Sequence, residues 1–68
     1  MNTDLIATPV NEISTGDVVI IDGSRYRVMF RALVRGIDIE LTIKSTAGRL
    51  SPEMRRTFSK YQSILKVA

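Results

Sequence analysis

The strongest constraint on the fold is a pair of neighbouring segments, residues 25–34 and 37–44, in which apolar and polar side chains alternate. Alternation with a period of two places every apolar side chain on one face of a β-strand. The apolar residues of the two segments are Tyr26, Val28, Phe30, Ala32, Val34, Ile37, Ile39, Leu41 and Ile43. The two segments therefore predict two antiparallel strands, each with one buried face.

The connection at Arg35-Gly36 predicts a two-residue hairpin turn between these strands. With that turn, Val34 faces Ile37, Val28 faces Ile43, and the whole apolar set falls on one side of the sheet. A slip of one residue would send the apolar set of one strand to the opposite face, so the pattern predicts its own register.

The polar face of the same hairpin carries charges of both signs. The expected register places Arg31 opposite Glu40, and such a pair is worth about 0.2–1 kcal/mol. Asp38 and Glu40 lie two residues apart on this face, a spacing that allows a carboxylate pair or a cation site. Acids that alternate along a solvated strand opposite arginines are more simply explained by solubility.

Upstream, residues 16–21 are apolar on both faces, which predicts an interior strand, and Asp22-Gly23 predicts a tight turn after it. The result is a three-stranded meander from Val18 to Lys44, in which the loop at Asp22-Gly23 has either two or three residues. Residues 7–14 contain Pro9, which favours an extended edge segment before a turn at residues 15–16.

The carboxyl third predicts a helix. Ser51-Pro52-Glu53 supplies an N-cap residue, a proline at the first helical position and an acid in the first turn. Spacings of four, three and four residues then define one stripe of an amphipathic helix, which we expect to pack on the sheet. The stripe consists of Met54, Phe58, Tyr61 and Leu65. Residues 62–68 either extend this helix or form a short closing strand, and both alternatives stay open.

The chain of 68 residues is expected to be one small domain, residues 1–68, with a short flexible amino terminus of about residues 1–6. We expect a mainly β fold with one C-terminal helix. Its strands form either a small barrel or an antiparallel meander of three to five strands. With 44% hydrophobic residues and no cysteine or histidine, stability is expected to come from packing, either within the chain alone or also against a second copy. No segment has the features of a signal peptide or a membrane span, and a cytoplasmic location is expected.

The run from Gly16 to Gly23, which leads into Tyr26-Arg27-Val28, resembles the opening hairpin of SH3-like small β-barrels. Such a Gly-Asp-x-Val strand, Asp-Gly turn and Tyr-x-Val strand is similar to KOW-type modules of translation and transcription proteins, and to short proteins encoded by phages or prophages. The resemblance covers residues 16–44. It implies an SH3-like barrel and a role as an accessory protein of a phage or mobile element, and it carries over no functional residue.

Catalysis is not expected, because the chain lacks the imidazole and thiol groups that supply most general bases, nucleophiles and metal ligands. The glycines at positions 16, 23 and 36 are separate turn residues, and no P-loop lysine follows them. No cofactor, metal site or small-molecule substrate is predicted. The remaining function is binding, most simply to another protein or to itself.

The first candidate surface is the arginine-bearing face of residues 25–35, where Met29 and Leu33 lie beside Arg31 and Arg35. Methionine and arginine are enriched at protein interfaces. Either this face is a protein interface, or the helix or a strongly bent barrel covers Met29 and Leu33 as part of one core.

The alternative partner is nucleic acid. A net charge of +3 favours anionic partners, and phosphate backbones are bound by clustered lysine and arginine. The candidate residues for this non-specific contact are Arg25, Arg27, Arg49, Arg55, Arg56 and Lys60. All four aromatic residues are assigned to buried positions, which disfavours a base-stacking platform.

Overall fold

The computed structural model describes residues 4–48 and 50–68, which form one antiparallel sheet and one short 3₁₀ helix. The elements are β1 (Leu5–Pro9), η1 (Val10–Glu12), β2 (Val18–Ile21), β3 (Ser24–Arg35), β4 (Asp38–Ser45), β5 (Glu53–Ser59) and β6 (Ser63–Val67). The order in the six-stranded sheet is β1-β6-β2-β3-β4-β5. The expected β2–β3–β4 meander is confirmed, with β2 an interior strand. The expected extended edge segment of residues 7–14 is confirmed only for residues 7–9, which belong to the edge strand β1, whereas residues 10–12 form η1.

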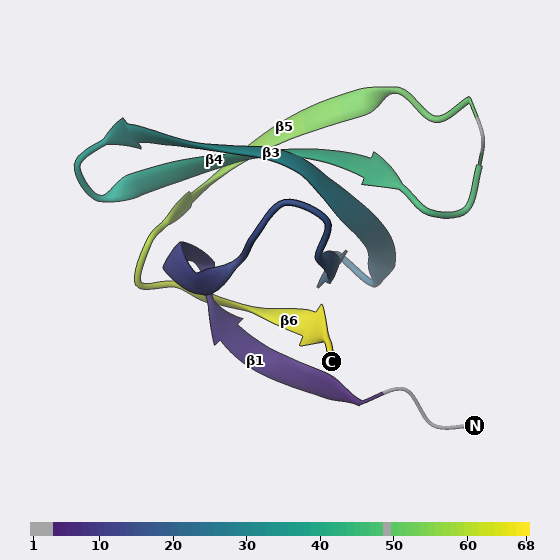
Figure 1. Ribbon diagram of the computed structural model, residues 1–68, viewed down its shortest axis with the longest axis horizontal. Coiled ribbons are helices and arrows are strands. Elements are labelled where there is room, and N and C mark those ends of the chain that lie inside the picture. Colours follow the sequence, from purple (N-terminus) through teal and green to yellow (C-terminus); the bar gives the residue numbers. More distant parts are fainter. Residues whose placement is uncertain (1–3, 49) are drawn as a thin grey trace.

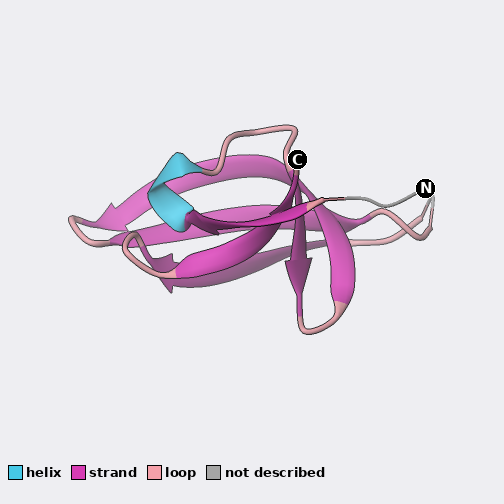
Figure 2. Cartoon of the chain, turned by 90° about the horizontal axis from the view of Figure 1, so that it is seen from below, coloured by secondary structure: helices cyan, strands magenta, loops and turns pink. Residues whose placement is uncertain are grey.

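The sheet curls so that β3, β4 and β5 form one layer while β1 and β6 form another, with η1 between them (Figure 1). Figure 2 shows the strands and the short helix η1 from below. The buried core consists of Val10, Ile13, Val19, Ile21, Val28, Ile39, Leu41, Ile43 and Phe58. Val10, the first residue of η1, and Ile13, which follows η1, are fully buried. The backbone N–H of Val10 donates to the carbonyl oxygen of Gln62 at 2.8 Å, which holds η1 against the β5–β6 corner.

The turn between β2 and β3 follows the sequence prediction. Ile21 is paired with Ser24, which leaves Asp22 and Gly23 as a two-residue loop. Their φ angles are +52° and +82°, and two successive positive φ values are the requirement of a type I′ hairpin turn.

The expected register of the β3–β4 hairpin is correct only at its base. Val28 is paired with Ile43 as predicted, but one extra residue on β3 at Met29 and a second at Val34 shift the pairing. The loop is therefore Gly36-Ile37, with Arg35 paired with Asp38. Gly36 has a φ of +51°, and a type II′ turn has glycine at this first loop position.

The shift at Met29 exchanges the two faces of the outer half of β3. Because side chains alternate along a strand, one extra residue sends Phe30, Ala32 and Val34 away from the core. Arg31 then lies opposite Leu41 and not opposite Glu40, so the expected Arg31–Glu40 pair does not form. The guanidinium of Arg31 instead donates to the carbonyl oxygen of Asn11 at 3.3 Å.

The prediction of a C-terminal helix is wrong. Residues from Glu53 to Ser59 form strand β5, which pairs with β4 along its whole length. The period-two pattern is Met54, Arg56 and Phe58, which lie opposite Ile43, Leu41 and Ile39. An arginine in the middle of the core-facing set conceals that alternation in the sequence.

The remaining residues of the expected helical stripe are distributed along two other elements. Tyr61 lies in the β5–β6 turn and is 72% exposed, and Leu65 lies in β6. Of the two alternatives left open for residues 62–68, the closing strand is therefore the correct one. Of the four stripe residues, Phe58 alone belongs to the buried core. Ser51 precedes β5 and caps no helix. At the other terminus, Leu5 and Ile6 belong to β1, and residues 1–3 lie outside the described range.

Candidate functional site

The outer part of β3, residues 29–35, has a strand partner on one side only among the described residues; we call it the distal edge of β3. Pairing with β2 ends at Val18–Arg27, and the last backbone bonds on that side join Val28 to Gly16 and Asp17. Pairing with β4 continues to Arg35. The distal edge therefore presents unpaired backbone N–H and C=O groups, which can pair with a further strand.

Large apolar side chains are exposed along and beside this edge. The exposed fractions are 66% for Phe30, 65% for Leu33, 49% for Val34 and 56% for Ile37 in the adjoining turn. Single exposed apolar residues are normal on protein surfaces, whereas a contiguous group marks a binding surface. These four residues lie within eight positions of one hairpin and flank the distal edge of β3, with Leu33 on one face and Phe30 and Val34 on the other.

The structure places the predicted interface residues on different sides of β3. Leu33 is exposed on the side that bears Arg31, whereas Met29 is half-buried at the bulge on the opposite side. Arg35 lies opposite Asp38 at the end of the hairpin. The sequence pattern missed Phe30 and Val34, which it assigned to the core, because no residue type marks the position of the bulge.

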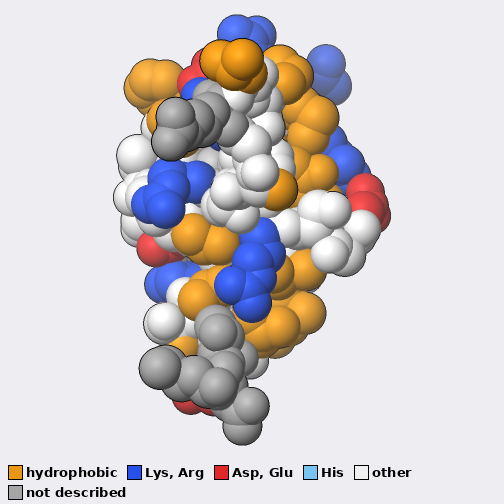
Figure 3. Space-filling model, turned by 90° about the vertical axis from the view of Figure 1, so that its right-hand side faces the viewer, with side chains coloured by type: hydrophobic (Ala, Val, Ile, Leu, Met, Phe, Trp, Pro, Cys, Tyr) orange, Lys and Arg blue, Asp and Glu red, His pale blue; other side chains and the backbone are white. Residues whose placement is uncertain are grey.

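The predicted nucleic-acid residues do not gather on one surface. Arg25, Arg27 and Arg55 lie on the outer face of the sheet. On the core-facing side of β5, Arg56 forms an ion pair of 3.3 Å with Asp22, and the Lys60 ammonium lies 5.2 Å from the Tyr61 ring centroid in the β5–β6 turn. Arg49 lies outside the described residues. At the end of the molecule in Figure 3, the cationic side chains form groups separated by hydrophobic and uncharged ones.

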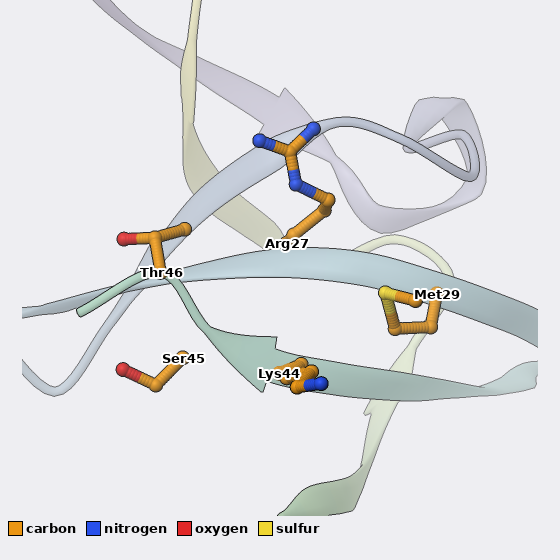
Figure 4. Close-up of a pocket in the computed structure, with 5 residues that line it drawn as sticks. All are labelled: Arg27, Met29, Lys44, Ser45 and Thr46. Atoms are coloured by element: carbon orange, nitrogen blue, oxygen red, sulfur yellow. The ribbon is translucent and has the colours of Figure 1, made fainter. Parts of the chain in front are cut away.

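A pocket of about 250 Å³ lies at the base of the β3–β4 hairpin, close to the Met29 bulge. Its lining residues are Arg27, Met29, Lys44, Ser45 and Thr46. Figure 4 shows them arranged around the place where β3 passes the end of β4. Lys44, Ser45 and Thr46 were not among the sequence candidates, although the expected register already sets Arg27 opposite Lys44.

Within residues 4–48 and 50–68, no group of three or more acidic side chains is placed to hold a metal ion. Asp38 and Glu40 lie on the outer face of β4, where their cross-strand neighbours on β3 are Arg35 and Ala32. The described part of the chain contains no helix long and apolar enough to cross a membrane.

Comparison with protein-family models, curated proteins and solved structures yielded no match to this chain.

Proposed function

We propose that this protein is a non-catalytic binding module that takes up an extended segment of a partner protein as an additional strand on the distal edge of β3. The observation that carries the proposal is the coincidence of an unpaired strand edge with exposed Phe30, Leu33 and Val34. Strand addition obtains affinity from main-chain hydrogen bonds and specificity from alternate side chains.

The two faces of the distal edge specify the chemistry of the partner. On the outer face an added strand lies beside Phe30, Ala32 and Val34, and apolar side chains suit that position. On the other face it lies beside Arg31 and Leu33, where a carboxylate suits the guanidinium. We therefore expect the partner segment to alternate apolar with acidic residues.

Charge favours such a partner over a second copy of this chain. The distal edge of β3 contains two arginines, Arg31 and Arg35, and no acidic residue. Two copies paired through their distal edges would match their apolar rows, but they would leave both arginines without a carboxylate on the adjoining strand. Like charges at neighbouring cross-strand positions are destabilising.

Non-specific nucleic-acid binding is less well supported than protein binding. It requires a cationic surface that follows the phosphate backbone. The candidate cations lie on several parts of the molecule, and Arg56 is already paired with Asp22.

The direct test is a titration with a synthetic peptide of alternating valine and glutamate, blocked at both ends, followed by amide NMR. We expect saturable shifts at residues 29–35. The matched control is the same peptide with lysine in place of glutamate, which should not bind. Equal binding of both peptides would overturn the acidic-partner assignment.

Two variants separate the distal edge from other exposed apolar sites. Phe30→Ser combined with Val34→Ser should weaken peptide binding about tenfold or more, because the apolar row contributes to the complex. Ile6→Ser removes an exposed apolar side chain from β1, which pairs with β6 and not with β3, and should leave binding unchanged. Equal losses in both variants would contradict the proposed site, as would a concentration-dependent dimer through residues 29–35 in sedimentation.

A further inference from the structure

The pocket beside the Met29 bulge brings two cations together without an acidic residue in its lining. Arg27 and Lys44 are direct cross-strand partners on β3 and β4. Like charges directly opposite each other in a sheet are destabilising. Neither side chain forms an ion pair within residues 4–48 and 50–68. A pair of this kind is stabilised when an anion lies between the two charges.

Hydroxyl groups complete the lining of the pocket. The Ser45 hydroxyl oxygen accepts the backbone N–H of Ala47 at 3.1 Å, which leaves its own hydrogen free to donate. Thr46 contributes a second hydroxyl, and its backbone is held to β3 because its N–H donates to the carbonyl oxygen of Arg25 at 3.2 Å. Guanidinium, ammonium and hydroxyl groups are the donors that bind phosphate oxygens.

One carboxylate lies near this arrangement, on the far side of Lys44. Glu53 of β5 is the cross-strand partner of Lys44, but it does not line the pocket and forms no ion pair with Lys44 in the described part of the chain. Glu53 therefore reduces the positive potential at Lys44, but its carboxylate does not fill the pocket between Lys44 and Arg27. The Met29 bulge leaves an extra β3 residue at the rim, and bulges are frequent beside functional sites.

We propose that this pocket is a binding site for a phosphate group, with Arg27 and Lys44 as its charged ligands and the Ser45 and Thr46 hydroxyls as further donors. The site adjoins the distal edge of β3 at Met29, but its proposed ligands lie outside that edge, and its occupation does not depend on a protein partner. The phosphate is either free in solution or part of a nucleic-acid backbone, and both sources present the same oxygens.

The test is a titration of the isotopically labelled protein with inorganic phosphate at constant ionic strength, balanced with chloride. We expect saturable amide shifts centred on Arg27 and on residues 44–46. Shifts that rise linearly without saturation, or that spread evenly over all lysines and arginines, would overturn the site.

Matched variants test the role of each charge. Arg27→Gln and Lys44→Gln should each weaken phosphate binding about tenfold, the effect of one charge-assisted hydrogen bond. Lys60→Gln removes a cation elsewhere and should leave the affinity unchanged. Glu53→Gln should instead tighten binding about twofold to threefold, because it removes the neighbouring negative charge. Backbone spectra of the free variants verify the fold, and unchanged affinity in both Arg27→Gln and Lys44→Gln contradicts the proposal.

A second arm replaces inorganic phosphate with a short oligothymidylate and with thymidine monophosphate. Tighter binding of the oligonucleotide at the same amides, with an affinity that falls steeply with salt, identifies a nucleic-acid backbone as the source. Equal affinities for all three probes identify a free phosphate group. If none of the three saturates the pocket amides, the proposal is wrong.

Discussion

The base and the distal end of the β3–β4 hairpin are built from the same alternating pattern, yet their exposure is opposite. At the base, Val28 and its partner Ile43 are fully buried. Two residues farther along β3, Phe30 is 66% exposed. The difference comes from the single extra residue at Met29, which reverses the faces of the strand. Burial in this hairpin thus depends on a bulge as much as on alternation.

In the distal half of the hairpin, β3 and β4 also differ from each other in the exposure of their apolar side chains. Ile39 on β4 is 2% exposed, whereas its direct partner Leu33 on β3 is 65% exposed. Ile39 lies between Leu33 and Phe58 in the same cross-strand row, and Phe58 belongs to the core. Among the described residues, no strand pairs with residues 29–35 of β3 on the side away from β4, so this part of the core ends at β4.

The largest expected effect comes from one substitution made at two leucines. Leu41→Ala should lower the free energy of unfolding by about 2–5 kcal/mol, because Leu41 is fully buried. Leu33→Ala should change it by less than about 0.5 kcal/mol. Urea denaturation of both variants measures the difference. Similar losses would show that the distal part of β3 is covered in the folded protein.

A smaller effect distinguishes two aspartates. Asp17 accepts the backbone N–H of Ser14 at 2.8 Å and lies 3.5 Å from the Lys66 ammonium, with its side chain 20% exposed. Asp17→Ala should therefore cost about 1–2 kcal/mol.

Asp22 provides the comparison, because its ion pair with Arg56 is exposed to solvent. The side chain of Asp22 is 79% exposed and that of Arg56 is 45% exposed. Asp22→Asn should cost less than about 0.5 kcal/mol, because exposed ion pairs contribute little and asparagine also tolerates positive φ. Thermal melts of both variants test this order. A larger loss for Asp22→Asn would show that the contact between β5 and the β2–β3 turn stabilises the fold more than an exposed ion pair does.

The parts of the fold that were predictable from the sequence are those with local signals. Asp22-Gly23 predicted its turn because both positions require positive φ, and β4 was predictable from the alternation of Ile39, Leu41 and Ile43. The turn at Gly36 was found within one residue of its position, because the glycine marks the loop without defining the register.

The other parts depend on long-range packing. Ser51-Pro52-Glu53 has the composition of a helix start, and nothing local to it indicates that residues 53–59 pair with β4. Arg56 occupies a core-facing position because it reaches Asp22 in a turn 34 residues away. Likewise, the two extra residues at Met29 and Val34 reconcile the pairing of Val28 with a loop at Gly36-Ile37. The position of the exposed apolar group follows from the bulge at Met29, so it could not be predicted from alternation.

The most direct test of the account is amide hydrogen exchange of the protein with and without the valine–glutamate peptide. Strand addition predicts slowed exchange for those amides of residues 29–35 that point away from β4, since they become hydrogen-bonded to the added strand. The exposed edges of β1 and β5 should show no change. Slowed exchange at β1 or β5, or peptide binding with no added protection at residues 29–35, would contradict the assignment of the distal edge of β3 as the binding site.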